Sequence, residues 1–276
     1  MRKNILGMSG SSIYSDASKF NELYLEGIEH IEIGEFSSEG DFENFLEFNN
    51  TKSTSFGIHS PLVRIGSKYD LLEKVKFEPK YAWEQLECEA KKLSKLGAEY
   101  LLVHFPYFKG EALGDTTVII ENGLKRLKGI QDTYNIDIIC EPKLGMKRCS
   151  KGIEYLQKIP KELWGKYNIG LCIDIGDYII AMGDEIIKCL EKWKEFVRVV
   201  HLHNIHYEEN NYIWTPVHPD DENDKNKHKV KEIIKFLAKC EDVIFIFEHT
   251  PETKPSTKFV MEGVKWTSNI INGDNV

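Results

Sequence analysis

The sequence lacks an excess of basic residues, and this absence argues against a nucleic-acid partner. The 276 residues include 36 Lys and Arg but 44 Asp and Glu, which gives a formal net charge of −8. Because contacts to phosphates supply most of the affinity of nucleic-acid-binding proteins, such proteins usually have the opposite balance. Hydrophobic residues make up 41% and charged residues 29% of the chain, a composition typical of a packed globular core.

Targeting segments and cysteine motifs are also lacking. The N-terminal stretch MRKNILGMSGSSIYSD contains only a short apolar step, so we expect neither a signal peptide nor a membrane-spanning helix, and therefore a cytoplasmic protein without a membrane partner. The six cysteines form no CxxC pair, which favours reduced thiols over a disulfide framework. Residues 7–12 do not have the glycine spacing of a nucleotide-binding loop.

Eight short runs rich in Ile, Val and Leu recur along the chain. They cover residues 4–8, 30–36, 55–59, 99–104, 136–141, 170–174, 198–203 and 243–248. The segments between them have helical spacing, as in residues 81–96, where Trp83, Leu86, Ala90 and Leu93 share one stripe. The pattern predicts strands and helices in strict alternation.

Nearly continuous apolar strands separated by helices indicate a parallel sheet whose two faces are both buried. Eight such units predict an α/β fold, a single (β/α)₈ TIM barrel that spans residues 1–276 as one domain. The alternative, an open doubly wound sheet, usually has a glycine-rich turn after an early strand, and this turn is missing. Residues 204–226 are long for a connection in a compact domain, so we expect a lid or a binding loop there.

Charged residues end the predicted strands, where the active sites of such barrels lie. Glu141, Asp174, His201 and Glu248 end four consecutive strands and would meet above the barrel. A buried charge is costly unless it is paired or bound to a metal, so these residues are the predicted ligands of one divalent ion. Carboxylate-rich sites suit Mn²⁺, our first choice, with Mg²⁺, Co²⁺ or Zn²⁺ as alternatives. A structural network of ion pairs at the rim is the other interpretation.

Further polar and aromatic residues near the same end are candidates for substrate binding. They are His59, His104, His203, Trp214 and His218. A single histidine at a strand end is most often a hydrogen-bonded structural residue, and a tryptophan most often packs in the core, so each has a structural alternative. His203 is also a candidate for supporting the metal site. Glu32 and Glu35 are expected as charges at the rim, and Cys172 as a buried, inert thiol.

These strand ends resemble those of the xylose isomerase-like barrels, a superfamily that includes sugar isomerases, ketose 3-epimerases and the endonuclease IV group (AP endonuclease family 2). The series Glu141, Asp174, His201 and Glu248 is similar to the metal ligands of the ketose 3-epimerases. His59 and His104 are similar to histidines of the endonuclease IV group, and they could hold a second metal together with His218. Glu141-Pro142-Lys143 resembles the triplet of xylose isomerases in which the Lys hydrogen-bonds the carbonyl oxygen of the sugar.

Three departures limit what the resemblance implies. Asp177 stands where the ketose 3-epimerases have a His, and residues 204–207 lack their Arg. Pro216-Val217-His218 stands where endonuclease IV has an Asp-x-His pair. Together with the acidic net charge, these departures favour a sugar or sugar phosphate isomerase or epimerase over an endonuclease IV-like phosphodiesterase acting at abasic sites. A barrel that only binds its ligand is a third hypothesis.

The resemblance implies an enzyme that moves a proton or a hydride beside a sugar carbonyl. In the proton-transfer version Glu141 and Glu248 act as acid and base, and in the hydride-shift version Lys143 polarises the carbonyl. His59 and His104 would contact the hydroxyls of the substrate. The expected partner is a small sugar or sugar phosphate, and the sequence leaves a homodimer open.

Overall fold

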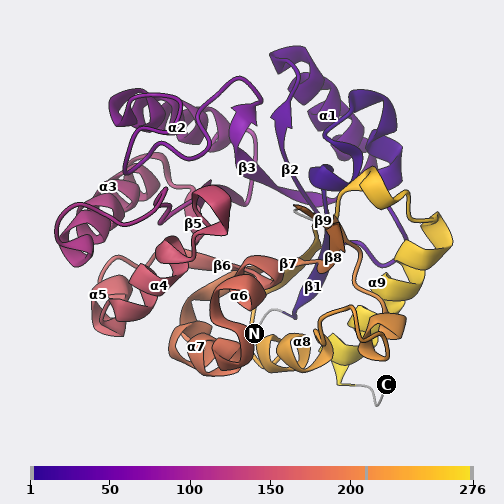
Figure 1. Cartoon of the computed structure of the whole chain (residues 1–276). Helices are drawn as coiled ribbons and strands as arrows, with labels where there is room; N and C mark the ends of the chain where they lie inside the picture. Colours follow the sequence, from indigo (N-terminus) through magenta and orange to yellow (C-terminus); the bar gives the residue numbers. More distant parts are fainter. Residues whose placement is uncertain (1–2, 209–210, 274–276) are drawn as a thin grey trace.

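A closed eight-stranded parallel barrel forms the centre of the computed structural model, which describes residues 3–208 and 211–273 (Figure 1). The strands are β1 (Ile5–Ser9), β2 (His30–Phe36), β3 (Ser55–Val63), β4 (Tyr100–His104), β5 (Asp137–Glu141), β6 (Gly170–Asp174), β7 (Val197–Leu202) and β10 (Ile244–Phe247). They pair in the order β1-β10-β7-β6-β5-β4-β3-β2, so the last strand closes on the first. The predicted TIM barrel is confirmed, and each predicted strand overlaps an observed one, although β3 continues to Val63, beyond the predicted end at residue 59.

Helices surround the barrel on its outer side (Figure 1). They are α1 (Glu39–Lys52), α2 (Pro79–Leu93), α3 (Thr116–Tyr134), α4 (Lys151–Lys158), α5 (Lys161–Gly165), α6 (Ile175–Met182), α7 (Ile186–Trp193), α8 (Lys231–Leu237) and α9 (Thr257–Asn272). Short 3₁₀ helices are η1 (Gly10–Ile13), η2 (Ala17–Leu23), η3 (Met146–Arg148), η4 (Gly183–Glu185), η5 (Lys194–Phe196), η6 (Pro219–Glu222) and η7 (Pro251–Thr253). The predicted stripe on α2 is buried against the barrel, as helical periodicity requires. In the described part of the chain, no helix is long and apolar enough to cross a membrane.

The interior of the barrel is not uniformly apolar. One ring of buried side chains consists of Tyr100, Leu102, Ile139, Cys172, Val199 and Ile246. His30 and Glu32 of β2 are buried as well, each with 0% of its surface exposed. The expectation that Glu32 is a charge at the rim is wrong, because the strand directs this carboxylate into the barrel. Glu35 does lie at the rim, where its carboxylate pairs with Lys68 at 2.7 Å.

The long connection after β7 folds into a β-hairpin. Its strands β8 (Asn204–Glu208) and β9 (Asn211–Thr215) are antiparallel and lie at the mouth of the barrel (Figure 1). From the loop after β5, the guanidinium of Arg148 lies 3.8 Å from the centroid of the Tyr212 ring in this hairpin. A cation over an aromatic face is attracted by the ring quadrupole, so this contact holds the hairpin against the barrel.

The Glu89 carboxylate is buried between α2 and β3, where it accepts hydrogen bonds from the Ser60 hydroxyl at 2.7 Å and from the Leu62 amide at 2.9 Å. Burial raises the pKa of Glu89, and the hydrogen bonds offset this effect only in part. A carboxyl whose pKa is higher in the folded than in the unfolded state takes up a proton on folding. The free energy of unfolding therefore falls as the pH rises from the unfolded to the folded pKa.

Glu89→Gln is expected to abolish this decrease in the free energy of unfolding with rising pH, which reaches at most about 1.4 kcal/mol per pH unit. Glutamine keeps an acceptor for Leu62 and cannot ionise. Urea denaturation between about pH 4.5 and pH 8 should therefore show that the variant gains stability relative to the wild type as the pH rises. Glu84→Gln, on the exposed side of the same helix, is the control. Parallel pH profiles for the wild type and Glu89→Gln would contradict the prediction.

Candidate metal centre and active site

Four predicted ligands converge above the barrel. Glu141 ends β5, Asp174 ends β6, His201 lies near the end of β7 and Glu248 follows β10, so adjacent parallel strands bring them to one place. One donor atom from each lies within 4.8 Å of the donor atoms of the others. The first three side chains have 0% of their surface exposed, whereas 15% of the Glu248 side chain is exposed.

The orientation of the His201 ring tests whether this group suits a cation. Its Nε2 lies 2.9 Å from a carboxylate oxygen of Glu32, which can only accept, so Nε2 carries a proton. Its Nδ1 lies 2.8 Å from Glu248 and 3.4 Å from Glu141 without making a hydrogen bond to either. The Nδ1 atom is therefore turned toward the carboxylate oxygens of the group. Three carboxylates and one imidazole nitrogen in this arrangement fit a divalent cation.

The ammonium group of Lys143 neutralises the acidic side of the site. Its Nζ lies 2.8 Å from Glu141, 2.5 Å from Asp174 and 3.0 Å from Asp177. Burial alone lowers the pKa of Lys143, but the charges of Asp174 and Asp177 outweigh it and raise this pKa well above its usual value. Burial and the charge of Asp174 raise the pKa of Asp177 to about 7. Asp177, which replaces the expected histidine, therefore belongs to the Lys143 ion-pair network.

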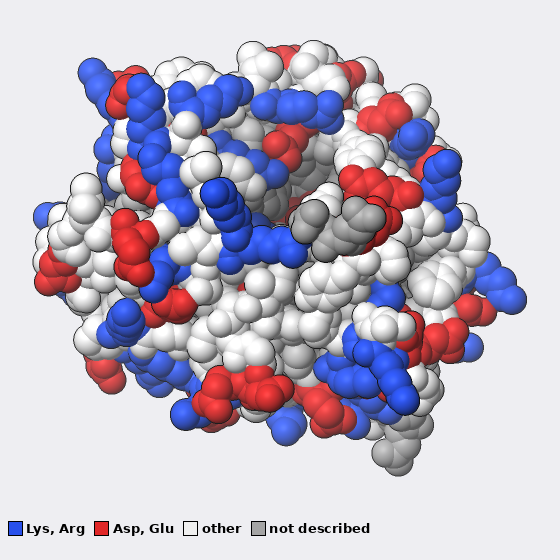
Figure 2. All heavy atoms as spheres, in the orientation of Figure 1, with Lys and Arg blue, Asp and Glu red and all other residues white. Residues whose placement is uncertain are grey.

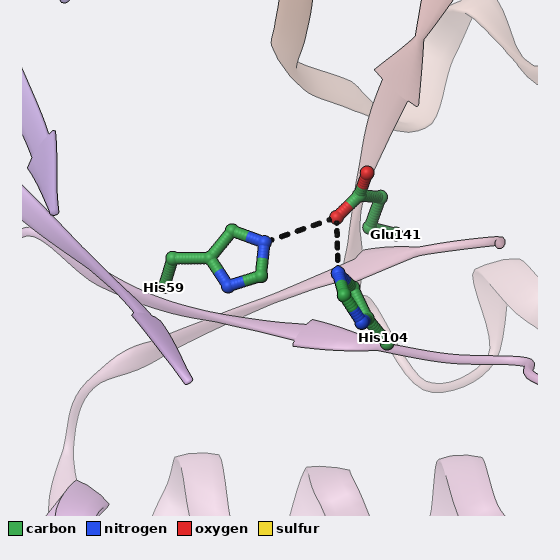
Figure 3. A group of neighbouring side chains, drawn as sticks. All are labelled: His59, His104 and Glu141. Carbon is green, nitrogen blue, oxygen red and sulfur yellow. Dashed lines mark hydrogen bonds and ion pairs between the residues drawn. The ribbon is translucent and has the colours of Figure 1, made fainter. Parts of the chain in front are cut away.

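Glu141 is held from a second side by two histidines. The Nε2 atoms of His59 and His104 lie 3.3 Å and 3.1 Å from the same oxygen of Glu141, and both rings point toward it (Figure 3). Burial alone raises the pKa of Glu141, but the nearby charges, led by Lys143 and His104, hold this pKa well below its usual range. Glu141 is therefore a permanent anion. His59, His104 and Glu141 also form a second group whose donor atoms could hold a metal.

His203 contacts the site through Asp174. Its Nε2 lies 2.8 Å from Asp174 Oδ1, and its ring packs against Trp214 of β9 at a centroid distance of 3.9 Å. Gly176, at the start of α6, leaves space for these two rings. A Cβ at this position would lie 2.2 Å from His203 Cε1 and 2.7 Å from the Trp214 ring. The hairpin is thus joined to the candidate ligand Asp174 through two rings in contact, tilted by 46° to each other.

Gly176→Ala is expected to displace His203 and Trp214 and to destabilise the fold by about 1–3 kcal/mol, the usual range for overpacking. The shift of the Trp214 ring should also change the tryptophan fluorescence. Gly129→Ala is the matched control, since nothing lies within 4 Å of its added Cβ on the exposed face of α3. Equal urea-denaturation midpoints for the two variants would contradict the expected clash.

A cavity of about 480 Å³ opens beside this centre, and Figure 2 shows the hollow at the mouth of the barrel. Among the predicted residues, those that line it are His59, His104, Lys143, Trp214 and Glu248. Arg64, Lys68 and Tyr69 are among the lining residues that the sequence did not indicate, because they lie beyond residue 59, where the third predicted strand ended. Glu141 is not part of the lining.

His218 is not brought to the cavity. Its ring stacks on Phe259 of α9 at a centroid distance of 3.9 Å, and its Nε2 lies 3.3 Å from Glu262 of the same helix. His218 lies in the segment that leaves the hairpin after Thr215, directly before η6, and this segment packs against α9. A second metal site that includes His218 with His59 and His104 therefore does not form in this structure.

The fold and this site define a (β/α)₈ barrel with a carboxylate-rich candidate metal centre at the carboxyl ends of its strands. The chain belongs to the xylose isomerase-like TIM barrel family, whose profile matches residues 38–270. No curated protein matches the sequence significantly.

Similar solved structures cover nearly the whole chain. A D-tagatose 3-epimerase-like protein has a TM-score of 0.68 at 18% identity and covers 98% of both chains. The 3-keto-D-glucoside 4-epimerase from E. coli has a TM-score of 0.66 at 10% identity, with 97% of this chain and 100% of the other covered. An L-ribulose 3-epimerase has a TM-score of 0.65 at 12% identity, over 99% and 95% of the two chains. At these identities the likeness establishes the shared fold.

Proposed function

We propose that this protein is a metal-dependent isomerase or epimerase of a sugar or sugar phosphate. The observation that carries the proposal is the convergence of Glu141, Asp174, His201 and Glu248 beside a cavity of about 480 Å³, a volume suited to a small molecule. Family membership supports it, as does the likeness to structures named as sugar epimerases.

These four residues would hold one divalent cation, with Mn²⁺ as the first choice and Mg²⁺, Co²⁺ or Zn²⁺ as alternatives. Such a cation supplies electrostatic stabilisation of the negative charge that develops when a proton is removed beside a carbonyl.

Glu248 is the group best placed to move the proton. Its side chain lines the cavity and is partly exposed, so a substrate carbon can approach its carboxylate. Glu141 is fully buried, and its two oxygens already accept from Lys143, His59 and His104. We therefore assign the acid and base role to Glu248, while Glu141 remains an anionic ligand and positions the groups around it.

The remaining lining residues bind and orient the substrate. Lys143 lines the cavity, and its ammonium group would hydrogen-bond the carbonyl oxygen in exchange for one of its three carboxylate partners. His59 and His104 would contact hydroxyl groups, and the Trp214 ring would cover an apolar face of the sugar and exclude water. Asp174, held by His203, keeps the ammonium of Lys143 in place.

The test is metal analysis of the purified protein, followed by turnover assays with a panel of ketoses and aldoses, free and phosphorylated. We expect one tightly bound divalent ion per chain and interconversion of at least one sugar pair. In D₂O, deuterium at the reacting carbon supports proton transfer by Glu248, and its absence supports a hydride shift aided by Lys143. A protein that binds no divalent metal would refute the proposal.

A phosphodiesterase of the endonuclease IV type is the second candidate, and the group formed by His59, His104 and Glu141 favours it. It requires a second ion in this group, so it predicts two or more metals per chain and cleavage of abasic DNA. The net charge of −8 and the position of His218 against α9 count against it. The same metal analysis, with an abasic oligonucleotide as substrate, separates the two functions.

A further inference from the structure

A column of polar side chains runs through the barrel beneath the candidate metal centre, from His201 through Glu32 and Tyr100 to His30. His201 Nε2 lies 2.9 Å from one oxygen of Glu32, and the Tyr100 hydroxyl lies 2.8 Å from the other. His30 Nε2 lies 3.2 Å from that hydroxyl. We call these four residues the interior column. His30, Glu32 and His201 have 0% of their surface exposed and Tyr100 has 3%.

The interior column crosses an otherwise apolar region. The Tyr100 ring packs in the buried ring of side chains that includes Leu102 and Val199. Gly57 makes space for it, because a Cβ at position 57 would lie 2.3 Å from Tyr100 Cζ. A buried carboxylate is costly unless donors surround it, so an anionic Glu32 requires both of its hydrogen bonds.

The charge of Glu32 sets the direction of every hydrogen bond in the interior column. A carboxylate only accepts, so His201 donates from Nε2 and Tyr100 donates its hydroxyl proton. The Tyr100 oxygen then accepts from His30 Nε2, and His30 Nδ1 accepts from the Ser55 hydroxyl at 2.8 Å. Burial lowers the pKa of His30 to about 3, so this ring is neutral and its single proton is on Nε2.

We propose that Glu32, supported by Tyr100 and His30, is a positioning residue that fixes the ring of His201 so that its Nδ1 lone pair faces the metal. A hydrogen bond from the far nitrogen of a ligating imidazole to a carboxylate locks the tautomer and increases the basicity of the ligating nitrogen. The inference rests on the proposed function insofar as His201 is taken as a metal ligand.

The variant Glu32→Gln separates charge from packing. Its amide can accept from His201 and donate to Tyr100, which reverses the lower part of the interior column. Tyr100 then donates to His30 Nε2, the His30 proton moves to Nδ1, and the Ser55 hydroxyl turns to the carbonyl of Glu29 at 3.3 Å. His201, Tyr100, His30 and Ser55 all keep a partner, so we expect the variant to fold with the opposite tautomer of His30.

The experiment titrates metal-free protein with Co²⁺, followed by calorimetry and by the visible absorption of the bound ion. Glu32→Gln is expected to weaken Co²⁺ binding about 10- to 100-fold. Tyr100→Phe leaves one oxygen of the buried carboxylate without its donor and should weaken binding at least about threefold. Glu89→Gln removes another buried carboxylate outside the interior column and should bind Co²⁺ like the wild type. Nitrogen-15 spectra of labelled histidines should show the His30 proton on Nε2 in the wild type and on Nδ1 in Glu32→Gln.

The outcomes distinguish this inference from the proposed function. A wild type that does not bind Co²⁺ refutes the metal site itself. If the wild type binds and Glu32→Gln binds equally well, Glu32 has no positioning role and the inference is overturned. If Glu32→Gln fails to fold, Tyr100→Phe decides, and an unchanged affinity in that variant overturns the inference.

Discussion

Replacing Glu248 by Gln is expected to reduce turnover of the sugar substrate by at least about 10³-fold, because the loss of a general acid and base alone typically costs 10² to 10⁴. The substitution removes the carboxylate that lines the cavity and also one of the four candidate ligands. Glutamine has nearly the same size, and the Glu248 side chain is partly exposed, so the fold should persist.

Steady-state kinetics at saturating Mn²⁺ measures this effect, with circular dichroism to verify folding. Isotope exchange in D₂O gives a second measurement, since the variant should exchange the substrate proton more slowly by a similar factor. Glu195→Gln, at an exposed ion pair with Lys161 on the outer face, is the control and should retain full activity. Turnover within tenfold of the wild type would show that Glu248 is not the proton-transfer group.

Lys143→Met is expected to destabilise the metal-free protein by about 3–5 kcal/mol, the usual cost of removing one partner from a buried ion pair. The reason is the position of the ammonium group within 3.0 Å of three carboxylates, those of Glu141, Asp174 and Asp177. Without it these buried groups repel one another or must take up protons. A divalent cation could replace part of the missing charge, so excess Mn²⁺ should restore more stability to the variant than to the wild type.

Urea denaturation in EDTA and in Mn²⁺ tests both parts of this prediction. Lys74→Met removes an exposed lysine paired with Glu78 and should change the stability by less than about 1 kcal/mol. A loss of less than 1 kcal/mol in Lys143→Met would mean that the three carboxylates are not jointly charged in the folded protein. Equal effects of Mn²⁺ on the variant and the wild type would mean that the ion binds elsewhere.

The sequence predicts the barrel and the four converging donors well, and the physical reason is the same for both. Parallel strands buried on two faces must be apolar, so a Glu, Asp or His at the end of such a strand stands out. Closure of the barrel then brings Glu141, Asp174 and His201 together without further information about loops.

The same reasoning could not predict the positions and contacts of residues in the loops or inside the barrel. Glu32 lies within β2 and not at its end. The candidate ligands were found by looking for charged residues at the ends of apolar strands, and this rule does not find a charge inside a strand. In the sequence, Tyr100 is an ordinary aromatic residue of a strand. Only the structure shows that its hydroxyl donates a hydrogen bond to Glu32. His218 follows a hairpin whose path depends on contacts far away in the sequence, such as Arg148 on Tyr212. Its position could not be inferred from its neighbours.

Lys143 affects which step comes first, closure of the barrel or binding of a metal ion. The ammonium of Lys143 is supplied by the same chain as the carboxylates it contacts, so their mutual repulsion is relieved as soon as the strands close. Closure of the barrel therefore does not depend on a metal ion to offset these charges. On the proposed function, the divalent ion would bind to a barrel that has already closed.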